Sequence, residues 1–234
     1  MSKTKKIKQK TTGFDIVYRV VTAIMAILIY PLFFFLDIIY IQVDHKTIAD
    51  IWGSITQNAT PDLGATYEDL SIPDMFEWAD MLSAFKSEES TFTFNNPNLY
   101  PLYAAIGFVA LALVIGLVIL GFAIFSNKVG AIIGLSASGL VCTIVSYFCF
   151  TSGFANPIID GKVTISQLLG PESNNLLDLI FGFVGNISFL NLEGGFFWVL
   201  FLMLGILVWS VSVLVVNKGE EKEKAMKEAA RKNR

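Results

Sequence analysis

Hydrophobic positions in this chain are gathered into four long runs and are not scattered in short periodic stretches. A bilayer core about 30 Å thick is crossed by roughly 20 apolar residues in a helix, and each run reaches that length. The first run holds only two charged residues, Asp15 and Arg19, close to its start, and the other three hold none. The pattern therefore predicts four transmembrane helices, at Phe14–Leu36, Leu102–Phe125, Val129–Phe150 and Phe196–Val216.

Charge alternates with these crossings. Residues 1–13 carry five Lys and no acid, the turn at 126–128 carries a lysine, and the tail at 217–234 carries seven basic residues against four Glu. Basic residues next to membrane helices mark the cytoplasmic side. We therefore expect both termini in the cytoplasm, a location in the plasma membrane, and the acidic segments 37–101 and 151–195 outside the cell.

The outside segments contain patterns that are typical of secondary structure. Ile38–Val43 is rich in β-branched residues and predicts a strand, whereas Asn58–Thr66, with Pro61 and Gly64, predicts a loop. Ser71 followed by Asp74 predicts the start of a short helix. Further strands are predicted at residues 91–94, 162–166 and 186–190, and further amphipathic helices at 48–55 and 173–184. The expected fold is an all-α membrane bundle with a small α+β cap that includes one antiparallel sheet.

Four aromatic residues in the first outside segment are candidate contact residues. They fall on stretches whose apolar residues have the spacing of amphipathic helices. Such side chains can pack the cap, sit among lipid headgroups or present a surface to a partner. We rank the three alternatives in that order for Trp52, Phe76, Trp78 and Phe85.

Small residues recur every four positions along the third crossing, with a shorter counterpart in the second. Because lipid tails are as apolar as leucine, helices associate in membranes by close backbone approach, which small side chains permit. The pattern predicts a helix-packing ridge, either within the bundle, which we favour, or against another subunit. Its members are Gly130, Gly134, Ser138, Cys142 and Ser146, with Ala112 and Gly116 as the counterpart.

Catalytic and metal-binding patterns are missing from the sequence. His45 is the only histidine, and both cysteines, Cys142 and Cys149, lie in the apolar third crossing. Ion-coupled carriers usually hold an ionisable residue in mid-membrane, and no crossing does so here. We expect no enzyme activity, no cofactor, no metal and no nucleic-acid partner.

In layout the chain resembles the claudins and their relatives, which also have four crossings, inner termini and a longer first outside segment. Trp52-Gly53 is the nearest counterpart to the tryptophan motif of the claudin first loop. The two loop cysteines of that family are missing, so the resemblance concerns topology alone.

These patterns favour a non-enzymatic interaction or assembly subunit, which meets a protein partner or its own copies through the cap and the small-residue ridge. The alternative is a channel or transporter component whose pore forms on oligomerisation. Several copies can line a pore without charged helices, and solute flux in liposomes separates the two hypotheses.

Overall fold

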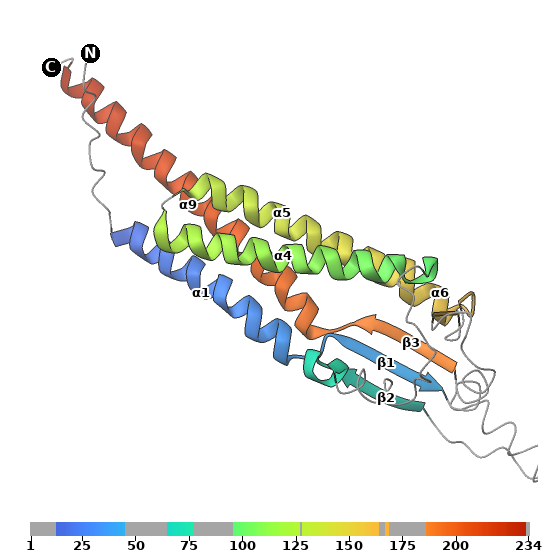
Figure 1. Ribbon diagram of the computed structural model, residues 1–234. Coiled ribbons are helices and arrows are strands. Elements are labelled where there is room, and N and C mark those ends of the chain that lie inside the picture. The colour runs from blue at the N-terminus through green and yellow to red at the C-terminus, as the bar shows by residue number, and fades with distance from the viewer. Residues whose placement is uncertain are drawn as a thin grey trace, which may run out of the picture.

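Four long helices run side by side in the computed structural model, which describes residues 13–44, 65–76, 96–126, 128–163, 167–168 and 186–232. The four predicted long apolar helices are confirmed as α1 (Gly13–Phe35), α4 (Tyr100–Phe125), α5 (Val129–Phe148) and α9 (Gly194–Lys232). The start of α1 and the end of α9 lie at one end of the bundle, the terminus end, and a small sheet lies at the other, the sheet end (Figure 1).

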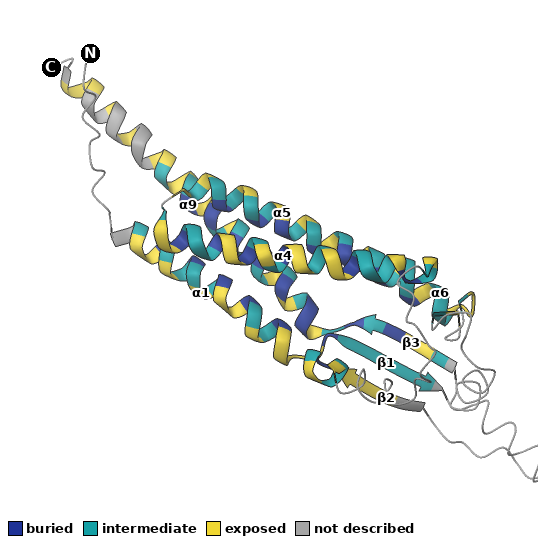
Figure 2. Cartoon of the chain, viewed as in Figure 1, coloured by how far each residue is buried: buried dark blue, intermediate teal, exposed yellow. Residues whose placement is uncertain are grey.

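The helices are apolar on the outside as well as the inside. In each helix, only 22% to 28% of the most apolar stretch is buried inside the protein. Large side chains such as Val114, Val141 and Phe201 point away from the bundle, and exposed positions run along every helix in Figure 2. A helix that is hydrophobic all round suits a bilayer, so the four helices indicate a multi-pass membrane protein.

The bundle is a closed ring in which α1 packs on α4, α4 on α5, α5 on α9 and α9 back on α1. Its core combines aliphatic residues such as Ile29, Ile119 and Met203 with a few buried hydroxyl groups. Tyr18 on α1 shares a 3.0 Å hydrogen bond with Ser210 on α9. Because the core of a bilayer holds no water, each buried hydroxyl group needs a hydrogen-bond partner inside the protein.

Hydrogen bonds from side chains of α1 and α5 tie α4 to its neighbours, among them those of Tyr30 and Ser146. The Tyr30 hydroxyl donates to the Leu113 carbonyl at 2.7 Å, and the Ser146 hydroxyl donates to the Ala105 carbonyl at 2.7 Å. Both acceptors are carbonyls of α4 itself. The partner side chains come from α1 and α5, so polar contacts fix α4 on both sides.

Strands β1 (Ile39–Asp44), β2 (Ala65–Leu70) and β3 (Asn186–Leu192) form an antiparallel sheet in the order β2-β1-β3. The predicted strands at 38–43 and 186–190 are confirmed. Residues 58–64 of the loop predicted over Asn58–Thr66 lie outside the described residues. The prediction is wrong at its end, because β2 begins at Ala65 and its backbone pairs with β1.

Other sequence predictions for the cap have mixed outcomes. Residues 162–163 form a bend and not the start of a strand. The strand predicted at 91–94 and the helices predicted at 48–55 and 173–184 lie outside the described residues.

The helix start predicted at Ser71 is confirmed by a helical turn at 72–76. The Ser71 amide donates to the Asp74 carboxylate at 2.9 Å, and the Ser71 hydroxyl also donates to that carboxylate. Hydrogen bonds from the Ser71 side chain, then from the backbone, hold the pKa of the Asp74 carboxyl below its usual range.

The third crossing, which begins with α5, runs on beyond its predicted end at Phe150. It passes into a π-helix, η2 (Cys149–Ala155), and then into α6 (Asn156–Ile159). Pro157 in α6 has no amide hydrogen, and in a regular α-helix its ring would clash with the carbonyl of Gly153, so the wider π turn relieves that conflict. Gly161, at φ +68°, follows α6 in the left-handed conformation that glycine tolerates best.

The charged tail continues α9 as one helix. Its 39 residues span about 58 Å, well beyond a hydrocarbon core of about 30 Å. The fourth crossing is thereby extended as a helix to Lys232.

Candidate interaction surfaces

Helix α5 packs into the bundle through a face of medium-sized and small residues. The neighbours come close at Gly139, where an added Cβ would lie 2.9 Å from the sulfur of Met203 on α9 and 3.4 Å from Ile115 on α4. This face therefore carries the contacts with both neighbouring helices. Its buried members are Ile132, Ser136, Gly139, Thr143 and Ser146.

The predicted small-residue ridge only partly coincides with that face. Gly130, Gly134 and Ser138 are exposed, Cys142 is half-buried and Ser146 is buried. Four residues turn a helix through about 400°, so each step of the ridge moves about 40° around the axis, and five members spread over about 160°. The ridge winds from the outside of the bundle into its core.

The counterpart on α4 lies inside. Ala112 and Gly116 are both buried. A Cβ on Gly116 would lie 3.1 Å from the Tyr30 hydroxyl oxygen and 3.4 Å from Ile29. These residues let α1 approach α4 closely.

By contrast, Gly130 and Gly134 have nothing within 4 Å of an added Cβ. Their spacing is the G-x-x-x-G pattern by which transmembrane helices approach one another. The bundle makes no use of this pair, so the exposed face defined by Gly130, Gly134 and Ser138 is open to another helix.

One predicted cap residue, Phe76, lines a groove at the sheet end. The groove has a volume of about 620 Å³ and lies between the end of α1 and the helical turn at 72–76. It is apolar, since the hydroxyl of Tyr30 is turned to Leu113. Trp52, Trp78 and Phe85 lie outside the described residues. The lining residues are Tyr30, Pro31, Phe34, Phe35, Ile72, Pro73 and Phe76.

An aromatic cluster on the sheet was not among the predicted contact residues. The ring of Tyr40 on β1 lies 6.1 Å from that of Tyr67 on β2 and 5.6 Å from that of Phe189 on β3, centroid to centroid. Tyr67 is 59% exposed and Phe189 is 43% exposed. The strand around Phe189 was predicted from the sequence, but the register shift that separates the faces of Phe189 and Ile187 was not, and Tyr67 belongs to the strand that the pattern missed.

Within the described residues, no group of three or more His, Cys, Asp or Glu side chains comes together to hold a metal ion. Cys142 and Cys149 are both free thiols and half-buried.

No protein-family model, curated protein sequence or solved structure matches this chain.

Proposed function

We propose that this chain is a non-enzymatic multi-pass protein of the plasma membrane that acts as an interaction or assembly subunit. In this proposal a transmembrane helix of a partner protein packs on the exposed face of Gly130, Gly134 and Ser138, and the cap offers a second contact. Both termini are cytoplasmic and the sheet end is outside the cell. The basic residues beside the terminus end support that orientation.

The observation that carries the proposal is that α5 has a G-x-x-x-G pair which its own bundle does not cover. Glycine lowers helix stability by about 1 kcal/mol relative to alanine in water. Two exposed glycines in one helix therefore do not stabilise the isolated bundle. A partner backbone that approaches closely would offset this cost through van der Waals contact.

The test is purification from the native membrane in mild detergent, at near-native expression. The mass of the complex and the identity of stoichiometric components are measured for the wild type and for the double variant Gly130→Leu/Gly134→Leu. Gly107→Leu is the matched control, because Gly107 is an exposed glycine of α4 that also has nothing within 4 Å.

We expect a second protein at fixed stoichiometry in the wild type and in Gly107→Leu, and its loss in the double variant. Retention of that protein in the double variant would refute the role of the exposed face. A complex made only of copies of this chain would replace partner binding by the pore alternative, which flux in liposomes then tests.

A further inference from the structure

The two faces of the sheet differ in chemistry. Successive residues of a strand point to opposite faces, and directly paired residues share a face. A register shift in β3, opposite Gln42 and Val43, adds one residue, so Phe189, paired with Gln42, and Ile187, paired with Val43, lie on opposite faces. Ile39 and Ile41 of β1 and Ile187 of β3 pack against the hydrophobic core. The opposite face carries the aromatic cluster, and none of its rings belongs to the core. This second surface, the aromatic face, consists of Tyr40, Gln42, Tyr67, Asp69, Phe189 and Asn191.

Carboxylates lie beside the rings. Asp69 is paired directly with Tyr40 across the β1–β2 ladder. Glu193 follows β3, two residues beyond Asn191, and its amide donates to the Ile38 carbonyl at 2.6 Å. The pKa of the Tyr40 hydroxyl is raised, first by desolvation among its neighbours and then by the negative field of Tyr67, Asp69 and Glu193. Two acidic groups and three rings therefore share one small area.

The whole sheet end has an excess of acid. Its described residues, 36–44, 65–76, 96–99, 149–163, 167–168 and 186–195, contain a single lysine, Lys162, which pairs with Asp160 at 2.8 Å. The field near the aromatic face is thus negative and favours cations. The acids in these ranges are Asp37, Asp44, Glu68, Asp69, Asp74, Asp160 and Glu193.

We infer that the aromatic face is a docking surface for an arginine- or lysine-bearing segment of a partner protein. A guanidinium or ammonium group stacks on the exposed ring of Tyr67 by cation–π attraction. Its charge then pairs with Asp69 on the same face of β2, and Gln42 and Asn191 supply hydrogen bonds to the segment's backbone. Arginine suits the surface better, because its planar group stacks on rings and pairs with a carboxylate at the same time.

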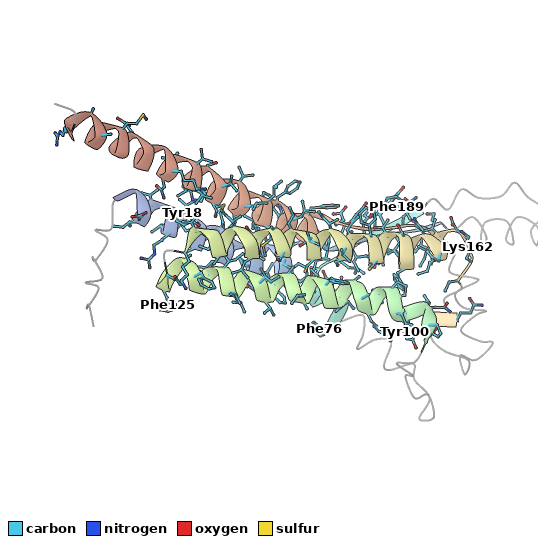
Figure 3. The ribbon with its side chains drawn as sticks, turned by 90° about the horizontal axis from the view of Figure 1, so that it is seen from above. Tyr18, Phe76, Tyr100, Phe125, Lys162 and Phe189 are labelled. Carbon is cyan, nitrogen blue, oxygen red and sulfur yellow. The ribbon has the colours of Figure 1, made fainter. Side chains whose placement is uncertain are left out.

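This inference deepens the proposed function by naming the chemistry of the partner, and it rests on that function. Its surface is nevertheless separate from the exposed glycine pair, which lies in the membrane. No residue of the aromatic face lines the apolar groove, and Phe76 and Phe189 lie apart in Figure 3. The two contacts can therefore be tested independently.

The experiment measures binding of a fluorescent peptide, Gly-Arg-Gly-Arg-Gly, to the full-length chain in phosphatidylcholine nanodiscs. Fluorescence anisotropy gives the Kd, and a Gly-Glu-Gly-Glu-Gly peptide is the probe control. The variants are Tyr67→Ala, Tyr67→Phe and Asp69→Asn. Glu68→Gln is the matched control, since it removes the same charge from the adjacent residue of β2, which is paired with Ile41 on the opposite face.

We expect the arginine peptide to bind and the glutamate peptide not to bind. Tyr67→Ala and Asp69→Asn should each weaken binding about fivefold, whereas Tyr67→Phe and Glu68→Gln should leave it nearly unchanged. Equal weakening by Glu68→Gln and Asp69→Asn would show that only net charge matters and would overturn the inference. Absence of peptide binding, or an unaffected Tyr67→Ala variant, would overturn it as well. None of these outcomes depends on assembly through α5.

Discussion

Single hydroxyl groups connect helices that the hydrophobic effect cannot hold together inside a bilayer. Tyr18 and Ser210 are buried and bonded to each other between α1 and α9. In membranes such bonds average about 0.6 kcal/mol and reach about 1.7 kcal/mol. The pair therefore stabilises one of the four helix contacts by a modest, measurable amount.

We predict that Tyr18→Phe and Ser210→Ala each destabilise the bundle and that their double-mutant cycle gives a coupling energy of about 0.6 to 1.7 kcal/mol. The measurement is reversible unfolding in mixed micelles. Ser212→Ala is the control, because Ser212 is exposed and donates to Val208 of its own helix. Its effect should add to that of Tyr18→Phe, and zero coupling between Tyr18 and Ser210 would contradict the bond.

At the scale of the element, the π-helix η2 lies in close contact with the start of α4. A Cβ on Gly153 would lie 2.6 Å from the Cβ of Pro101 and 3.2 Å from its Cγ. The proline ring is rigid and cannot turn away as a methionine side chain could. The position thus requires glycine for space and not for backbone conformation.

We predict that Gly153→Ala costs about 1 to 3 kcal/mol, the usual range for overpacking. Gly107→Ala, where nothing lies within 4 Å, should be neutral or slightly stabilising, since alanine is the better helix former. Thermal unfolding in detergent compares the two. Equal stability of both variants would mean that η2 shifts away from Pro101 at no cost.

Some elements were predictable from the sequence and others were not. Strand β1 was predictable from its β-branched residues, but β2, Ala-Thr-Tyr-Glu-Asp-Leu, is largely polar and becomes a strand through its pairing with β1. The small-residue ridge was visible as a spacing. Residues spaced by four do not stay on one face of a helix. Which members of the ridge are buried and which are exposed therefore depended on the orientation of α5 in the bundle.

For the whole molecule, four crossings and the segregation of charge predicted the arrangement in which both termini share one end. The sequence could not show the aromatic face, because Tyr40, Tyr67 and Phe189 come from three strands that are up to about 150 residues apart. Its rings are brought together only when β1 pairs with both neighbours. Function at this surface thus depends on long-range pairing, whereas the membrane topology depends on local hydropathy.

The orientation proposed for the molecule can be tested with two single cysteines in a Cys142→Ala/Cys149→Ala background. Lys162→Cys places a thiol at the sheet end and Met226→Cys places one on the tail of α9, and both positions are well exposed. Loss of the Lys162–Asp160 pair should matter little, because exposed ion pairs contribute about 0 to 1 kcal/mol.

We predict that a membrane-impermeant maleimide labels Lys162→Cys on intact cells and labels Met226→Cys only after permeabilisation. The basic residues at 1–13 and 217–234 favour the cytoplasm for the terminus end, and the acidic sheet end then faces outward. The reverse pattern would refute the orientation and would move the aromatic face, with any partner it binds, into the cytoplasm. Labelling of both thiols on intact cells would place the two ends of one bundle on the same side, which no arrangement of spanning helices allows.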